Sequence, residues 1–390
     1  MLSGCWKLLA IGRWRRSNLA KPQTIWSPAY LSEIPRKVPD RLLGTQRESM
    51  AMNFHENRLP GWTNEFAEQA LHAAVNGLED PLGNIAAYHF GWQTSTGEPS
   101  TSPAGKKLRP IMTIAVAEAL GGSVEDALPG ALAVDLVHNQ SLIHDDIIDA
   151  DSIRRHRPAV WAAFGTPEAI LAGDAVLTLG FQVLLDSPVA ARAARHLAES
   201  FQYMLRGQML DLDYEQRSDV TVDDYITMAA AKTGSLFGCA AGLGAICARA
   251  REETVQEMNV FGHHVGVAFQ LIDDILGIWG TPDAVGKPVS TDVRRRKKSG
   301  PVVAALTADN PGGENLRRMY ARPEPFSEDE ISLVTQLIDK AGGRSQAESI
   351  SQRYMTLARD ALDRLSFVPG SRQSLDKLLN STEFSIHRTH

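Results

Sequence analysis

The chain has 390 residues, of which 43% are hydrophobic and 22% charged, and its formal net charge is -6 at pH 7. This composition is ordinary for a soluble globular protein, and the length allows either one large helical core or two to three average domains. Cys5, Cys239 and Cys247 form no CxxC pair and leave an odd thiol, so neither a zinc knuckle nor a disulfide framework is indicated, and we expect a reducing compartment.

The first 50 residues differ in charge from the rest of the chain. They carry nine Lys or Arg against three acids, a net of +6, while the remainder carries 31 against 43, a net of -12. Basic and apolar residues alternate there, as in an amphipathic transit peptide or a membrane-surface segment. The alternative, which we favour, is a disordered leader. We therefore predict a basic extension at residues 1–60, one folded domain at 61–385, and a cytoplasmic location, with an organelle transit peptide as the other reading.

From about residue 65 onward, apolar residues recur every three or four positions, which predicts amphipathic helices. A Ser-, Thr-, Gly- and Pro-rich loop follows at 94–107, and Ser123 is a candidate N-cap. Later helical runs are expected at 129–150, 168–185, 190–214, 222–249, 252–279 and, as a group, 327–379. Because no strand alternation or βαβ rhythm is found, the sequence predicts an all-α fold, a single large helical bundle.

The most membrane-like stretch, 234–250, is rich in Gly, Ala and Cys. It is slightly short and too weakly apolar for a membrane span, so we expect a core helix and no integral membrane segment. The acidic body of the chain also argues against nucleic acid as a partner.

Two aspartate-rich stretches stand among apolar residues, at 145–149 and 273–274. Asp145 and Asp149 are four positions apart and share a helix face, with Asp146 beside them. Unpaired carboxylates in such surroundings need protonation, a basic partner or a hard cation, and oxygen ligands suit Mg²⁺. A solvated acidic face is the alternative, but Leu142 and Ile143 make this region too apolar for it.

Basic residues accompany both clusters, and together with metal-binding carboxylates they describe a site for polyphosphate groups. Taken alone, each is a weak signal, and the run 294–298 is by itself most typical of a solvated loop. The basic elements are Lys106, Lys107, Arg109, Arg154, Arg155, Lys232, Lys287 and 294–298.

The order of these motifs resembles the trans-isoprenyl diphosphate synthases over nearly all of residues 65–380. The motifs are Gly-Lys-x-x-Arg-Pro, Asp-Asp-x-x-Asp, Arg-Arg, Gly-Gln, Lys-Thr, Gln-x-x-Asp-Asp and Gly-Lys. The amino-acid sequences of the segments 87–92, 138–146 and 274–280 are most similar to those of actinobacterial geranylgeranyl-type enzymes. The resemblance implies the isoprenoid-synthase bundle around a central apolar cavity, a homodimer, and Mg²⁺-dependent condensation of isopentenyl diphosphate with allylic diphosphates.

The resemblance also implies a role for each matching residue. Three Mg²⁺ ions per site would be held by the two acidic motifs, with Asp145, Asp149 and Asp273 the expected direct ligands of a set comprising Asp145, Asp146, Asp149, Asp273 and Asp274. The residues expected to hold the allylic diphosphate are Arg154, Lys232, Thr233, Gln270, Lys287 and Lys297. Those expected to hold isopentenyl diphosphate are Lys106, Lys107, Arg109, His138 and Arg155. Gln208 would line the prenyl chains.

Two departures from the family pattern stand out. Lys107 replaces a common Arg, and Gly277 replaces the third aspartate of the second motif. Because Asp273 is expected to coordinate the metal ion, we predict an active enzyme.

The floor of the cavity would be formed by Gln140 and Ser141, just upstream of the first cluster. Since farnesyl-producing members often have large aromatic residues there, these smaller side chains imply a C20 product, geranylgeranyl diphosphate.

Four other interpretations remain open from the sequence. The product could be C15, farnesyl diphosphate. The chain could be the non-catalytic regulatory subunit of a heteromeric synthase, although such subunits usually lose one acidic motif. A class I terpene cyclase would need an Asn/Ser/Glu metal triad in place of Asp273 and Asp274. A metal-dependent phosphohydrolase built on His144 and Asp145 would need further histidines that are not suitably placed.

Overall fold

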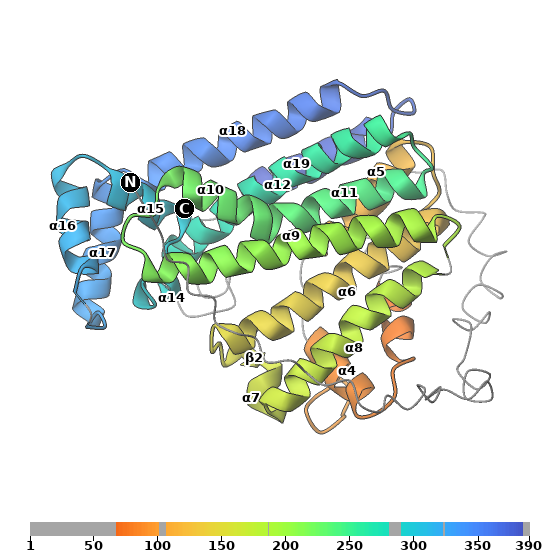
Figure 1. The fold of residues 1–390 in the computed structure, drawn as a ribbon, viewed down its shortest axis with the longest axis horizontal. Coiled ribbons are helices and arrows are strands. Elements are labelled where there is room, and N and C mark those ends of the chain that lie inside the picture. Colours follow the sequence, from red (N-terminus) through yellow and green to blue (C-terminus); the bar gives the residue numbers. More distant parts are fainter. Residues whose placement is uncertain (1–67, 101–106, 186, 281–289, 323, 385–390) are drawn as a thin grey trace, which may run out of the picture. The chain divides into compact units, whose positions relative to one another are not determined.

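The computed structural model describes residues 68–100, 107–185, 187–280, 290–322 and 324–384. The predicted extension at 1–60 lies outside the described residues. Helices account for almost all of the regular structure (Figure 1). In chain order the elements are α4 (Leu82–Phe90), α5 (Leu108–Ala119), α6 (Val124–Ile148), β1 (Ile153–Arg154), β2 (Arg157–Pro158), α7 (Val160–Phe164), α8 (Thr166–Leu185), α9 (Ala190–Gln216), α10 (Val222–Ala229), the π-helix η2 (Ala230–Gly234), α11 (Ser235–Cys247), α12 (Glu252–Trp279), α14 (Thr291–Arg294), α15 (Gly300–Thr307), α16 (Pro311–Tyr320), α17 (Glu328–Lys340), α18 (Gly343–Asp363) and α19 (Arg372–Phe384).

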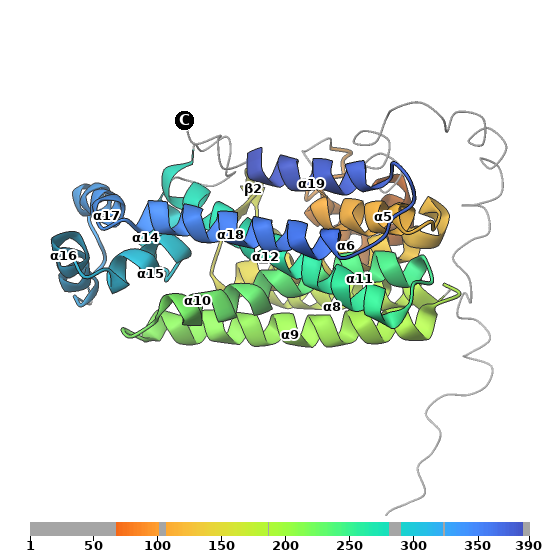
Figure 2. The same ribbon diagram turned by 90° about the horizontal axis from the view of Figure 1, so that it is seen from above.

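The helices α11 and α12 form the centre of the bundle. They pack against each other, and they lie between α9 on one side and α18 on the other (Figure 2). Every residue of α11 is buried. Its Gly, Ala and Cys side chains are small, so neighbouring backbones approach closely, and the large side chains of α5, α6 and α12 fill the surrounding core. The membrane-like stretch is therefore a core helix in this structure.

Most predicted helices are confirmed. The 252–279 run matches α12 at both ends, and Ser123 is the N-cap of α6, where its side chain accepts a hydrogen bond from the backbone N–H of Asp126. Pro129, taken as the start of a helix, lies inside α6, which begins five residues earlier. The sequence missed the two-residue strands β1 and β2, which form an antiparallel hairpin after the first acidic cluster, and the short helices α7, α14, α15 and α16.

Among the described residues, two helices are long and apolar enough to cross a membrane by length and composition. One runs from Val222 to Cys247, and 94% of its most apolar 18-residue stretch is buried in the protein interior. The other is α8, where only 44% of the corresponding stretch is buried. Its exposed apolar side chains are Ile170, Leu171 and Leu185, and the helix α9, which packs against it, exposes Tyr203, Leu205 and Met209. These two packed helices thus present apolar side chains that no described part of the chain covers.

Candidate active site

The first acidic cluster lies at the C-terminal end of α6. Asp145 is in the last turn and Asp149 is the C-cap residue. Carboxylates are unfavourable here because the end of the helix already carries partial negative charge. Burial raises the pKa of Asp149, and the charge of Asp145 raises it further. Asp145 Oδ1 is buried and accepts no hydrogen bond from the described residues. These oxygens therefore fit a hard divalent cation.

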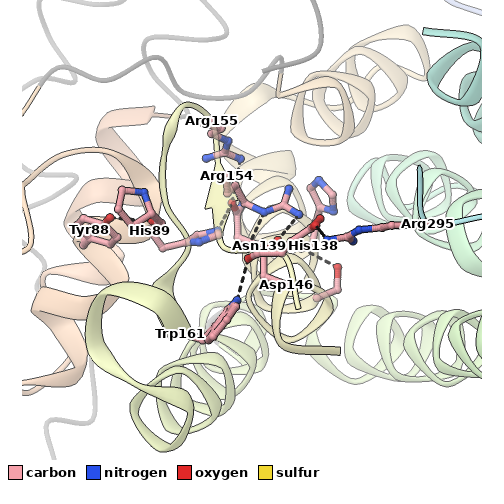
Figure 3. Close-up of polar contacts among 12 residues, drawn as sticks. Tyr88, His89, His138, Asn139, Asp146, Arg154, Arg155, Trp161 and Arg295 are labelled. Carbon is pink, nitrogen blue, oxygen red and sulfur yellow. Dashed lines mark hydrogen bonds and ion pairs between the residues drawn. The ribbon is translucent and has the colours of Figure 1, made fainter. Parts of the chain in front are cut away.

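Asp146 has a different role from its two neighbours. It is 1% exposed, and its carboxylate makes a bidentate pair with Arg154 of β1, with distances of 2.6 Å to Nε and 2.7 Å to Nη2 (Figure 3). Burial lowers the pKa of Arg154, but the hydrogen bond and charge of Asp146 outweigh it and raise that pKa. The metal role predicted for Asp146 stays a prediction, and Arg154 is a partner that the structure shows for both of its oxygens. Its two oxygens hold the Arg154 guanidinium beside the cluster.

Two lysines reach the first cluster from other elements. Lys232 Nζ is 2.6 Å from Asp211 Oδ2 and 3.5 Å from Asp145 Oδ1. Lys297 Nζ is 3.3 Å from the same Asp211 oxygen and 4.0 Å from Asp149 Oδ2. Burial would raise the pKa of Asp211, but the two lysines outweigh it and lower that pKa. Asp211 on α9 thus holds two ammonium groups at the place where a diphosphate could replace it as their partner.

In the second cluster, as in the first, one carboxylate is buried and hydrogen-bonded to other residues. Asp273 is exposed, whereas Asp274 is 6% exposed. Burial and the charge of Asp292 raise the pKa of Asp274 to about 7, while three hydrogen bonds lower it. Those three bonds, each 2.7 Å, come from Tyr225 Oη, Gln270 Nε2 and the Gly300 backbone N–H. The metal role predicted for Asp274 also stays a prediction, and in this structure its carboxylate accepts these three hydrogen bonds.

Lys232 and Thr233 lie in the π-helix η2, which interrupts the helix running from Val222 to Cys247. A π-turn inserts one extra residue, and such turns are frequent at functional sites. Thr233 Oγ1 donates to Gln270 Oε1 at 2.5 Å, so this turn is tied to the Asp274 network. Thr233 and Gln270, both predicted to hold the allylic diphosphate, are thus in contact, and Lys232 is the neighbour of Thr233 in the chain.

Gly207 allows α9 to touch the π-helix. A Cβ added there would lie 2.5 Å from Lys232 Cα and 2.6 Å from the Ala231 carbonyl carbon, so the backbones would have to separate. We predict that Gly207→Ala lowers the free energy of unfolding by about 1–3 kcal/mol through overpacking. Urea denaturation checks this, with Gln202→Ala, at an exposed position of the same helix, as the control. An unchanged free energy in the Gly207 variant would contradict the close approach.

A second basic group lies where α5, α6 and the hairpin meet. Lys107 Nζ is 2.8 Å from Asp135 Oδ2, and the Arg109 guanidinium stacks 4.3 Å from the Phe237 ring centroid. Burial lowers the pKa of Arg109 to about 10, opposed by Asp135 and Asp273. Burial and the charge of Arg109 lower the pKa of His138 well below its ordinary value, so its imidazole is neutral. The group offers two basic side chains and a neutral hydrogen-bonding ring.

The residues of this group that the sequence missed are His89 and Asn139. His89 Nε2 is 3.1 Å from Asn139 Oδ1, and Arg155 Nη2 donates to the same oxygen at 3.5 Å (Figure 3). Burial and the charge of Arg155 lower the pKa of His89 well below its ordinary value. The signal was a histidine inside the otherwise apolar segment 87–92, but its partner could not be found without the fold. Lys106 and Lys287 lie outside the described residues.

The basic run 294–298 is not a solvated loop. Arg295 pairs with Asp151, whose backbone carbonyl also accepts a 2.8 Å hydrogen bond from Trp161 Nε1 (Figure 3). Arg296 donates to the carbonyls that end α16, and Lys298 lies over the Tyr320 ring. The segment after the second cluster is thus fixed to the segment after the first.

The two residues predicted to form the cavity floor point in different directions. Ser141 is one turn before Asp145 on the same face of α6, and its Oγ donates to its own helix at His138 O, 2.7 Å away. Gln140 is 4% exposed, and its amide nitrogen is 2.9 Å from His144 Nδ1. His144 in turn lies against Ile170 of α8. Gln208 of α9 is half-buried.

The arrangement can be compared with known proteins. The sequence profile of the Polyprenyl synthetase family matches residues 92–338. The chain belongs to this family. It is 39% identical over 310 residues to a (2E,6E)-farnesyl diphosphate synthase of Mycobacterium tuberculosis, covering 78% of this chain and 86% of that protein. It is 41% identical over 295 residues to a geranylgeranyl diphosphate synthase of the same organism, covering 75% and 84%.

The fold agrees with this assignment. The crystal structure of a polyprenyl synthetase from Streptomyces coelicolor A3(2) superimposes with a TM-score of 0.79 at 41% identity, covering 83% of this chain and 98% of that one. This polyprenyl synthetase is therefore a transferase, a trans-prenyl diphosphate synthase of the short-chain type, and the family is Mg²⁺-dependent. The predicted family and all-α bundle are confirmed. The regulatory-subunit, cyclase and phosphohydrolase interpretations give way to prenyl transfer.

Proposed function

We propose that the enzyme condenses isopentenyl diphosphate with dimethylallyl, geranyl or farnesyl diphosphate and releases mainly the C20 product, geranylgeranyl diphosphate. The observation that carries this proposal is the small side chain of Ser141 on the face of α6 that bears Asp145, with its hydroxyl bonded back to the helix. Position 141 therefore presents no aromatic ring of its own to a prenyl chain that starts at Asp145 and runs down this face. Gln140, directed toward His144, contributes little to the floor in this proposal.

The residues support a Mg²⁺ site of three ions with Asp145, Asp149 and Asp273 as its protein ligands. Among the described residues, no three His, Cys, Asp or Glu side chains are grouped closely enough to hold a metal ion by themselves. Mg²⁺ commonly combines one or two carboxylates with substrate phosphate oxygens and water. The bound substrate would therefore complete the site, and it would lie between α6 and α12. When bound, Mg²⁺ would neutralise the charge that grows on the departing diphosphate.

The side chains of the enzyme divide the remaining work. Lys232, Lys297 and Arg154 are fixed cations at the first cluster, so they stabilise the allylic diphosphate as it leaves. Arg109 and neutral His138 hold isopentenyl diphosphate, whose double bond attacks the allylic carbocation. The departing diphosphate then accepts the proton. Apolar walls exclude water, which would otherwise capture the cation as an alcohol.

We propose that the enzyme is a homodimer. Support comes from the apolar side chains that the packed helices α8 and α9 expose, including Leu171 at 59% and Met209 at 67% exposure. A symmetric dimer formed over this face would bury them in an interface of the same two helices. Sedimentation of the wild-type protein and of Leu171→Glu would test the assignment, since the charge should separate the subunits.

Product analysis tests the chain length. The enzyme is incubated with Mg²⁺, isopentenyl diphosphate and, separately, each of the three allylic starters. We predict that the wild type accumulates C20, and that Ser141→Phe shifts most of the product to C15 because the ring blocks the next addition one turn below the diphosphate site. Gln140→Phe is the matched control, with a smaller effect expected. A C15 product from the wild type, or an unshifted spectrum from the Ser141 variant, would refute the proposal.

A further inference from the structure

Gly277 stands where the second acidic motif has no third carboxylate. It lies four residues after Asp273 on α12, so the two positions share a face. A Cβ built on Gly277 would lie 2.8 Å from Asp292 Oδ2 and 3.5 Å from Asp292 Cγ. The oxygens of an aspartate lie about 2.4 Å from their own Cβ by standard bond lengths. The Asp292 oxygen therefore lies nearly as close to the Cβ position of residue 277 as the oxygens of an aspartate there would lie.

Asp292 comes from a separate element, the short helix α14, and is half-buried. Its backbone carbonyl accepts a 2.9 Å hydrogen bond from the Lys297 N–H. Its carboxylate is close enough to Asp274 and to Lys297 that its charge contributes to raising the pKa of each. Lys297 in turn reaches Asp149 of the first cluster. Asp292 thus lies beside the second cluster and next to the lysine that extends to the first.

We propose that Asp292 supplies, from α14, the third carboxylate of the second acidic cluster and is a positioning residue for Mg²⁺-diphosphate bound through Asp273. Gly277 and Asp292 then form one unit, because the missing side chain on α12 creates the space into which the carboxylate of α14 fits. This inference rests on the proposed metal role of Asp273. It also explains how the enzyme keeps a three-carboxylate second cluster although its motif contains two.

A competing explanation is purely structural. Asp292 is the acid in the first turn of α14, and it lies beside Lys297, so it could act only by holding this segment in place. The two explanations differ in what happens when the carboxylate is moved. A role in holding α14 requires the negative charge on residue 292 itself. A role in the second cluster requires only that a negative charge lies beside Asp273, and an aspartate at position 277 of α12 would supply that charge.

The test therefore relocates the carboxylate. Binding of inorganic diphosphate is measured by calorimetry with and without Mg²⁺, for the wild type, Asp292→Asn, Gly277→Asp and the double variant Gly277→Asp/Asp292→Asn. We expect Asp292→Asn to weaken Mg²⁺-dependent binding by about tenfold or more, as for loss of a hydrogen bond to a charged group. We expect Gly277→Asp alone to bind poorly as well, because its carboxylate meets that of Asp292, and the double variant to bind nearly as the wild type does.

Controls separate the possible failures. Asp273→Asn should abolish the Mg²⁺-dependent part of diphosphate binding, and if it does not, the metal role of Asp273 and this inference fail together. If Asp273→Asn has its effect but Asp292→Asn binds as the wild type, only the inference fails. It also fails if the double variant binds no better than Asp292→Asn. Circular dichroism and the thermal midpoint of each variant show that folding is retained, and steady-state turnover of the same four proteins should follow the order of the binding constants.

Discussion

Replacing Asp145 with Asn is expected to lower kcat by about 10³-fold while leaving the metal-free protein at least as stable as the wild type. Loss of activity follows from the proposed role of Asp145 as a direct ligand. Stability follows from the charges in the absence of metal. Burial, with added repulsion from Asp145, raises the pKa of Asp149, and the nearby Asp145 Oδ1 is itself buried and accepts no hydrogen bond from the described residues. An amide at 145 removes part of that repulsion.

The stability that Asp149 contributes to the metal-free protein depends on pH. Because the pKa of Asp149 is higher in the folded state than in the unfolded state, the stability that this carboxyl contributes is fully present at low pH. It is lost as the pH rises through the raised pKa. The thermal midpoint in the presence of a chelator should therefore fall less steeply for Asp145→Asn than for the wild type as the pH increases above the ordinary Asp value of about 4. A variant that retains full turnover would contradict the ligand role, and one that unfolds more readily without metal would contradict the repulsion between Asp145 and Asp149.

The long elements could be predicted because each follows from a local rule. Helix α12 begins and ends where its periodic pattern does, and Ser123 caps α6 as its side chain and position predict. The hairpin of β1 and β2 could not be predicted, because two-residue strands give no alternation to detect. The π-helix η2 could not be predicted either, since its five residues carry no local signal for a wider turn, and its close approach to Gly207 of α9 is seen only in the fold.

In the candidate site too, some features could be predicted from the sequence and others depend on contacts between distant residues. Sequence spacing was sufficient to place Asp145 and Asp149 on one face of α6, and the pairing of Lys232 with that face follows from the family resemblance. Spacing could not show that Asp146 and Asp274 turn away from their neighbours, because that depends on a guanidinium from the hairpin and on three donors from separate elements. Contacts between distant parts of the chain, such as Asp292 with Gly277, have no local signal at all.

Removing the carboxylate of Asp146 should destabilise the metal-free protein, whereas Asp145→Asn should not. Asp146→Ala leaves the Arg154 guanidinium in the protein interior without its bidentate partner, and breaking a buried pair in this way costs about 3–5 kcal/mol. We therefore expect a large loss of folding free energy in metal-free protein. We also expect kcat/KM to fall, since Arg154 would no longer be held beside the diphosphate. Urea denaturation with a chelator, and steady-state kinetics on the folded fraction, measure the two effects.

A double-mutant cycle separates the two effects. In Asp146→Ala/Arg154→Leu neither charge remains, and an apolar side chain replaces the guanidinium, so most of the lost stability should return. Activity should not return, because the cation at the allylic diphosphate is gone. Arg154→Leu alone is the matched single variant, and it should resemble the double variant in activity. If Asp146→Ala is as stable as the wild type, Asp146 does not act through Arg154, and the metal role predicted for its carboxylate is favoured instead. If the double variant regains turnover, neither side chain is needed for turnover, which contradicts both roles.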